Sequence, residues 1–137
     1  MSVKAIAKSV KISPRKVSVV ASLVRGRTVA DALTILEHAP RNAAIPVSKV
    51  IKSARANADH NHRLKPDTLR ITEITVTPGP RSKRFRPVSR GMAHPYQKRT
   101  SHISVTVDGE ARPVKKPAAA KSESKNSSTK AQSKGDK

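Results

Sequence analysis

The sequence predicts an α+β fold, in which three helices pack on a small three-stranded antiparallel sheet and a long basic β-hairpin arm extends from that sheet. Apolar residues repeat every three or four positions in three consecutive segments, whereas period-two patterns precede these segments once and follow them twice. The last two strand patterns are separated by a basic segment, residues 81–99, with seven Lys or Arg and no Asp or Glu. This segment is the predicted arm.

The first strand is predicted at residues 3–12, where apolar and basic side chains alternate. The first helix follows within residues 13–26. Ser13 stands in the position of an N-cap, Pro14 suits the first helical position, and Gly26 supplies a stop. The apolar stripe of this helix consists of Val17, Val20, Ala21 and Val24.

Two more helices are predicted, at residues 28–40 and 41–61, the first with Thr28 as its cap. Pro46 would remove a hydrogen bond and clash with the preceding turn inside a helix, so we expect the third helix to begin near Ala44. The inward positions are Val29, Ala32, Leu33 and Leu36 in one helix and Ala43, Val47, Val50, Ile51, Ala54 and Ala58 in the other.

Two β-branched segments, residues 69–78 and 100–108, read as adjacent strands. Ile71 and Ile74 fall on opposite parities, which predicts a bulge or an early bend around Glu73. Residues 69–78 and 100–108 would thus form the last two strands of one antiparallel sheet.

A single pairing register is predicted to serve both the sheet and the arm. It pairs Ile74 with Val107, Val76 with Val105 and Phe85 with Tyr96, and it puts Arg90 and Gly91 at the turn of a hairpin spanning residues 78–103. Each limb would extend about ten residues past the sheet, or roughly 33 Å at ~3.3 Å per residue. The limbs should be partly irregular because four prolines cannot donate to the ladder, namely Pro78, Pro80, Pro87 and Pro95.

The arm is too poor in apolar side chains to be stable alone. Ordering about twenty backbone residues costs ~20 to 40 kcal/mol in conformational entropy. Burial of its apolar residues would return only ~10 kcal/mol. These residues are Phe85, Val88, Met92 and Tyr96. Phosphates of a surrounding polyanion are the simplest source of the missing stabilisation.

The charge of the chain indicates what that polyanion is. The 29 Lys and Arg against 9 Asp and Glu give a net charge of +20, which predicts a polyanionic partner. No acidic residue occurs from Ile74 through Val107, and no broad apolar face suited to a membrane accompanies these cations. Nucleic acid is therefore favoured. One Phe and one Tyr are too few for stacking platforms, so we expect recognition of shape and phosphates.

One domain is predicted at residues 1–110, arm included, and it is basic by itself, with 21 Lys and Arg against seven acids. Residues 111–137 contain one large apolar residue, Val114, and are predicted to be a disordered tail. The tail would act as a solubilising extension or as a polyanion-tethering arm. The sequence shows neither a signal peptide nor a bilayer-spanning segment, so a cytosolic location is expected.

Metal binding and catalysis find no support in the sequence. His60 and His62, at i, i+2, point to different faces of a helix, and the chain has no Cys to complete a set. The nine acids are scattered, and neither a glycine-rich phosphate loop nor a nucleophile elbow is present. We expect no enzyme, no cofactor, no metal and no small-molecule substrate.

The segment "KRFRPVSRGMAHPYQKRTSHISVTV", residues 83–107, resembles the arm and final strand of the bacterial-type large-subunit ribosomal protein L-twenty-two family. The earlier motifs "SPRKV", "LVRG" and "SARANADHN" and the pair Gly79-Pro80 match the same family in the same order. The resemblance covers about residues 5–107. It implies the fold predicted above and a structural protein that binds large-subunit (23S-type) rRNA, assists subunit assembly and lines the polypeptide exit tunnel with the tip of its arm.

The resemblance also implies site residues. Those expected at rRNA are Ser13, Pro14, Arg15, Lys16, Arg25, Arg81, Lys83, Arg84, Arg86, Arg90, Lys98, Arg99, Thr100, Ser101 and His102. Those expected at the tunnel wall are Val88, Ser89, Arg90, Gly91, Met92 and Ala93. The family usually has basic residues where this chain has Val88, Met92 and Pro95, which makes the tip less basic and more apolar.

The expected partners are large-subunit rRNA, neighbouring large-subunit ribosomal proteins and the nascent polypeptide, with no membrane. The expected location is the large ribosomal subunit in the cytoplasm. Two alternatives remain at this point. An architectural DNA-binding protein also uses basic β-arms with a proline wedge at the tip, and an RNA-modifying enzyme would need a cofactor pocket that the sequence does not indicate.

Overall fold

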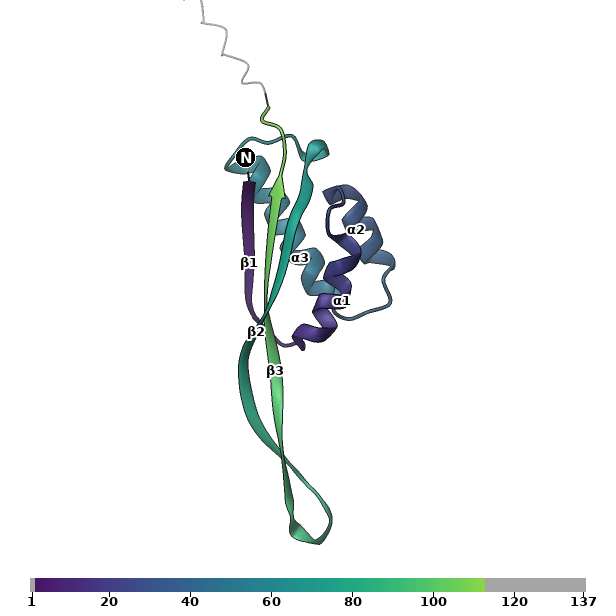
Figure 1. Cartoon of the computed structure of the whole chain (residues 1–137), viewed down its shortest axis with the longest axis vertical. Helices are drawn as coiled ribbons and strands as arrows, with labels where there is room; N and C mark the ends of the chain where they lie inside the picture. Colours follow the sequence, from purple (N-terminus) through teal and green to yellow (C-terminus); the bar gives the residue numbers. More distant parts are fainter. Residues whose placement is uncertain (1, 113–137) are drawn as a thin grey trace, which may run out of the picture.

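The computed structural model describes residues 2–112, in which three helices cover one face of a three-stranded antiparallel sheet (Figure 1). The strands are β1 (Ser2–Val10), β2 (Arg70–Pro87) and β3 (Ala93–Asp108), and the helices are α1 (Pro14–Val24), α2 (Val29–His38) and α3 (Ala44–His60). Strand β3 lies between β1 and β2. The predicted α+β class is confirmed. The predicted tail lies outside the described residues except for Ala111 and Arg112, which still pair with Leu64 and Arg63.

The helices begin near the predicted positions, with one difference in capping. Ser13 holds the N-cap position of α1, but its side chain makes no capping hydrogen bond, and its carbonyl accepts from the N–H of Lys16 at 3.0 Å. The Thr28 hydroxyl does cap α2, because it accepts from the N–H of Asp31 at 3.2 Å. Helix α3 begins at Ala44, so Pro46 falls in the first turn, where N–H groups have no partner within the helix.

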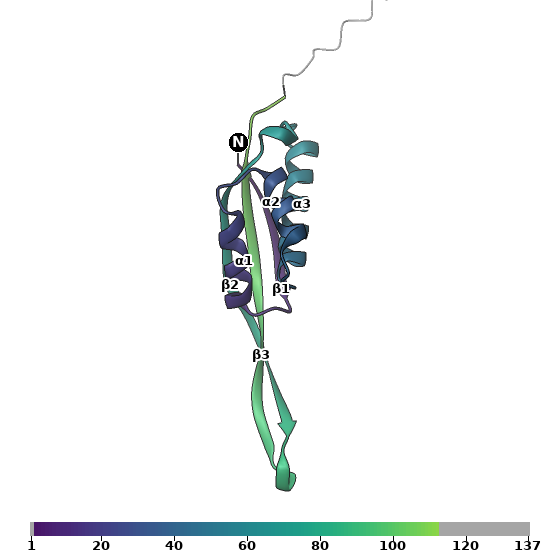
Figure 2. The same cartoon turned by 90° about the vertical axis from the view of Figure 1, so that its right-hand side faces the viewer.

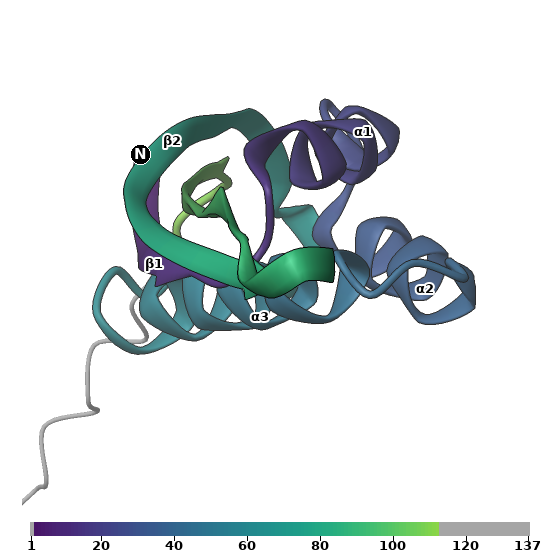
Figure 3. The same cartoon turned by 90° about the horizontal axis from the view of Figure 1, so that it is seen from below.

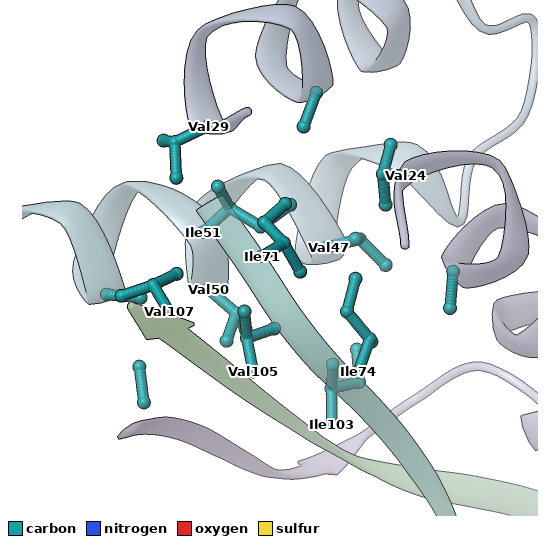
Figure 4. Packing of buried hydrophobic residues seen from close by; sticks show 14 of the residues in the cluster. Val24, Val29, Val47, Val50, Ile51, Ile71, Ile74, Ile103, Val105 and Val107 are labelled. Atoms are coloured by element: carbon teal, nitrogen blue, oxygen red, sulfur yellow. The ribbon is translucent and has the colours of Figure 1, made fainter. Parts of the chain in front are cut away.

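The hydrophobic core lies between the helices and the inner face of the sheet (Figure 4). The largest fully buried side chains include Ile51 of α3, Leu69 before β2, Ile71 and Ile74 of β2, and Ile103 of β3. The predicted stripes of the three helices face this core, although Leu33 is only partly buried. The core gives the body, here residues 2–80 and 100–112, its fixed shape.

The predicted register is wrong by one or two residues. Ile74 pairs with Val105 and Val76 with Ile103, and in the projecting part Arg84 pairs with Tyr96. The register shifts once between Ile71 and Glu73 and again between Pro78 and Arg81. The first shift is the bulge that the sequence predicted. Because each shift adds one residue to β2, no single register can serve both the sheet and the arm.

Strands β2 and β3 stay paired beyond the end of β1, as far as Pro87 and Ala93. This projecting hairpin, residues 81–99, is called the arm below, and it extends from one end of the body with no helix beside it (Figures 1 and 2). Its end is a loop of residues 88–92 containing a short 3₁₀ turn, η2 (Ser89–Gly91). Arg90 and Gly91 both have positive φ angles, 60° and 69°, so the turn lies where the sequence placed it.

Candidate nucleic-acid interface

The seven basic side chains of the arm are all exposed to solvent. They are Arg81, Lys83, Arg84, Arg86, Arg90, Lys98 and Arg99. No acidic residue stands between positions 74 and 107, so no carboxylate within the arm can pair with them. Their contacts within the described residues are weak and local: Nη1 of Arg84 donates to the carbonyl of Lys83 at 2.9 Å, and the Arg86 guanidinium lies 5.9 Å from the ring centroid of Tyr96.

The register distributes these cations over both faces of the arm, since residues directly opposite each other on paired strands share a face. One face carries the pairs Ser82–Lys98, Arg84–Tyr96 and Arg86–His94. The other carries Arg81–Arg99, Lys83–Gln97 and Phe85–Pro95. Each face thus holds three cations and one aromatic ring. An arm that docked on a flat surface would need cations on one face only, so this distribution fits an arm with polyanion on both sides.

The apolar side chains of the arm are exposed. Phe85 is 76% exposed and Met92 is 68% exposed, and Val88 and Tyr96 are exposed as well. Such side chains gain hydrophobic stabilisation only if another molecule covers them. The structure therefore agrees with the prediction from the sequence that the arm buries too little apolar surface to offset the entropy lost in ordering it.

The root of the arm is tightly packed. A Cβ atom at Gly79 would lie 2.5 Å from Oγ1 of Thr100, so only glycine fits beside this side chain. The Thr100 hydroxyl donates to the carbonyl of Pro80 at 2.7 Å. Nδ1 of His102 accepts from the N–H of Ser9 at 2.9 Å, which ties β3 to the irregular end of β1. Thr100 and His102 thus orient the arm, whatever else they contact.

Ser101 does not belong to the candidate interface. Its side chain is 0% exposed, because Ser101 shares the inward face of β3 with Ile103 and Val105. Its hydroxyl has no hydrogen-bond partner among the described residues. The expectation that this side chain meets RNA is therefore wrong. The sequence already indicated the inward position, because Ser101 stands two residues before Ile103 and four before Val105 on the same strand.

The predicted body residues fall into two groups. Arg15 and Lys16 are exposed, and Ser13 and Pro14 are partly exposed, at the start of α1, which lies at the end of the body from which the arm leaves (Figure 1). Arg25 follows the opposite end of α1, and its Nη2 donates to the carbonyl of Ile74 at 3.1 Å. The fold thus separates Arg25 from the other predicted body residues and engages its guanidinium within the protein.

Two exposed cations near the start of α1 escaped the sequence analysis, namely Lys11 and Arg41. They are thirty positions apart in the chain, and only the fold brings them to one hollow. No signal in the sequence pairs them. Lys4 and Lys8 of β1 lie on the uncovered face of the sheet, beside hydroxyl side chains of β2 and β3.

The described residues contain no group of three His, Asp or Glu side chains that could hold a metal ion. His60 and His62 are exposed. Among residues 2–112, no helix is long and apolar enough to cross a membrane.

A small basic α+β body with a projecting hairpin that carries cations on both faces fits the class of nucleic-acid-binding proteins. The family model for ribosomal protein L22p/L17e matches residues 5–108. A large ribosomal subunit protein uL22 from Oceanobacillus iheyensis is 51% identical over 107 residues, which are 78% of this chain and 95% of that protein. A second uL22, from Desulfitobacterium hafniense strain Y51, is 52% identical over 104 residues, which are 76% of this chain and 91% of that protein.

The chain belongs to the ribosomal protein L22p/L17e family. It is a structural component of the large ribosomal subunit, located in the ribosome in the cytoplasm, and it is not an enzyme. Membership implies rRNA and other ribosomal proteins as partners. The architectural DNA-binding protein and the RNA-modifying enzyme are thereby set aside.

Proposed function

We propose that the arm runs through folded large-subunit rRNA and that its tip, residues 88–93, lines the tunnel through which the nascent polypeptide leaves. The body would sit near the outer end of this tunnel. In binding rRNA, the protein would also assist the assembly of the subunit.

The observation that carries this proposal is the placement of exposed cations on both faces of the arm, with no acidic residue from Ile74 through Val107. Phosphates on both sides would neutralise the mutual repulsion of the cations and supply charge-assisted hydrogen bonds. Burial between RNA strands would also cover Phe85 and Tyr96, which stand on opposite faces. An RNA environment on all sides thus supplies each contribution that the isolated arm lacks.

The geometry of the tip supports its proposed place at the tunnel wall. The loop is closed by a hydrogen bond from the N–H of Val88 to the carbonyl of Met92, at 2.8 Å. This closure leaves the side chains of Val88, Arg90 and Met92 exposed. With one cation between two apolar side chains, the tip would offer a passing polypeptide a mixed surface.

Site-specific photo-crosslinking tests the proposal. A photoreactive amino acid replaces Met92 at the tip or, as the control, Ser53 on the exposed side of α3. On ribosomes stalled with a labelled nascent chain, the Met92 position should crosslink to both rRNA and the nascent chain, and the Ser53 position should not reach the nascent chain. Incorporation of the Met92 variant into ribosomes without any crosslink to the nascent chain would contradict the proposed tunnel contact.

Removal of the arm tests the same proposal from the other direction. Pro80 and Thr100 are in hydrogen-bond contact, so a short Gly-Ser linker can replace Arg81 to Arg99 without stretching the body. The shortened protein should remain folded, because none of the removed residues is buried. It should bind large-subunit rRNA more weakly and with a smaller salt dependence. Unfolding of the shortened protein would show that the arm is part of the core.

A further inference from the structure

The two edges of the sheet are treated differently by the rest of the body. Strand β2 forms one edge, and the turn between α1 and α2 bonds to its backbone there. The N–H of Gly26 donates to the carbonyl of Ile71 at 3.0 Å, and the N–H of Ile71 donates to the carbonyl of Arg27 at 2.9 Å. Nη2 of Arg25 donates farther along the same edge, to the carbonyl of Ile74 at 3.1 Å. The body's own residues thus occupy part of the β2 edge.

Strand β1 forms the other edge (Figure 1). From Ser2 to Ala7 it pairs regularly with β3 on one side, and no hydrogen bond from another part of residues 2–112 reaches this stretch. Helix α3 packs against β1, whereas α1 packs against β2, as the view along the strands shows (Figure 3). An edge strand of this kind presents N–H and C=O groups that can pair with another extended chain.

The outward side chains of β1 form a row of cation, apolar residue and cation. Lys4, Ile6 and Lys8 are exposed, Ile6 by 54%, while Val3 and Ala5 at the alternate positions are buried. The row borders a hollow of about 540 Å³ over the outer face of the sheet. The rest of the lining is mostly hydroxyl side chains of β2 and β3, namely Thr75, Thr77, Ser104 and Thr106.

Neither lysine of this row has an ion-pair partner within residues 2–112. Among the described residues that line the hollow, Glu73 alone is acidic, and it belongs to β2, so β3 separates it from both lysines. Its Oε1 also accepts a hydrogen bond from the Thr75 hydroxyl at 2.7 Å. Two lysines on either side of an exposed isoleucine therefore match a strand that carries acids on either side of an apolar residue.

Charge decides among the candidate occupants of this edge. A second copy of the chain, paired antiparallel with Ile6 opposite Ile6, would set Lys4 against Lys8 twice, and like charges directly opposite are destabilising. Residues 113–137 carry seven Lys against two acids, so they too would bring lysine to lysine. The occupant that fits is a segment with acids at the positions where these two have lysines.

We propose that the β1 edge, residues 2–8, binds an extended segment of another protein in which an apolar residue stands between two acidic residues at alternating positions. The segment adds a fourth strand beside β1. Its acids lie opposite Lys4 and Lys8, and its apolar residue lies against Ile6. The same lysines repel other basic strands, so they select this partner as well as attract it. The inference concerns a contact with protein and does not depend on the proposed path of the arm through rRNA.

Peptide titration of the full chain in solution tests the chemistry of the β1 edge. The probe is a synthetic peptide of about eight residues in which Glu and Val alternate, and the control peptide alternates Lys and Val. The backbone amide NMR shifts of residues 2–8 should change with the first peptide and not with the second. Shift changes confined to other parts of the protein, or equal changes with both peptides, would overturn the inference.

Charge reversal gives the matched variants for this titration. Lys4→Glu with Lys8→Glu should weaken binding of the Glu-Val peptide by about 10-fold or more. The control, Lys49→Glu with Arg55→Glu on the exposed side of α3, should change it by less than about twofold. All four side chains are exposed, so thermal unfolding should be unchanged in both variants. Equal weakening in the two variants would contradict a site at β1.

Pairing of the two backbones has its own test. One version of the Glu-Val peptide is N-methylated at its Glu residues and another at its Val residues, because only one of these two sets of N–H groups points toward β1 in a paired strand. One version should fail to bind and the other should bind. Binding of both would show attraction of charges without a fourth strand, and the inference would fall.

A photoreactive amino acid in place of Ile6 tests the same edge in assembled ribosomes. It should crosslink to a protein segment with the acidic, apolar, acidic pattern, which mass spectrometry of the crosslinked peptide identifies. Crosslinks to rRNA alone, to a segment without this pattern or to nothing would overturn the inference while leaving the proposed function intact.

Discussion

The body and the arm are built from the same two strands but obtain their shape in different ways. In the body, β2 and β3 carry Ile71, Ile74 and Ile103 into a core closed by three helices. In the arm, the same strands carry cations and exposed rings on both faces, and none of residues 81–99 is buried. Within the protein, the arm is therefore held mainly by the hydrogen bonds between its two strands. Only the body also has the buried apolar surface that stabilises paired strands in water.

Truncation of one side chain in each region tests this difference, and it should give the largest change in the free energy of unfolding. Ile51 is 0% exposed in the core, so Ile51→Ala should lower the free energy of unfolding by about 2 to 5 kcal/mol. Phe85→Ala in the arm should change it by less than about 0.5 kcal/mol, because this side chain is 76% exposed. Urea denaturation of the free protein measures both. A large loss of stability in the Phe85 variant would show that the arm belongs to the folding unit.

The next largest loss of stability is expected at the junction between the body and the arm. In Gly79→Ala, the new methyl group would meet the Thr100 hydroxyl, which is held by its hydrogen bond to Pro80. Overpacking of this kind costs about 1 to 3 kcal/mol. The double variant Gly79→Ala with Thr100→Ala should recover part of the loss, because the clashing hydroxyl is gone. If Gly79→Ala is as stable as the unaltered protein, the root is looser than the structure indicates.

The smallest effect concerns Ser101, at the body side of the junction. Its buried hydroxyl has no partner among the described residues, and a buried polar group without a hydrogen bond is destabilising. Ser101→Ala should therefore raise the free energy of unfolding by about 1 kcal/mol. Ser104→Ala, on the partly exposed face of the same strand, is the matched control and should be neutral. A loss of stability in the Ser101 variant would mean that the hydroxyl is satisfied after all.

The body could be predicted from the sequence more fully than the arm, for a physical reason. Burial imposes periodicity, so the stripes of the three helices and the bulge near Glu73 were legible in the chain. The second register shift lies at Gly79-Pro80, where the arm begins. Neither face of the arm packs on the core, so no apolar pattern in the sequence reveals this shift. The predicted register was wrong in both regions, by one residue in the arm and by two in the sheet, where a two-residue slip leaves every side chain on the same face.

The candidate site was likewise predictable from the sequence only in part. The cations of the arm are contiguous in the sequence, so composition alone identified them. Which face each cation occupies depends on the register and needed the structure. Lys11 and Arg41 meet Lys16 only because α1 and α3 begin side by side, and such a tertiary arrangement leaves no local signal in the sequence.

Amide hydrogen exchange tests the central claim most directly, namely that RNA and not the protein's own core stabilises the arm. Exchange is measured by mass spectrometry on the free protein and on the assembled large subunit. In the free protein, amides of residues 81–99 should exchange at nearly unprotected rates while those of α3 are protected, and in the subunit both should be protected. Protection of the arm in the free protein equal to that of Ile103 and Val105 would contradict the claim.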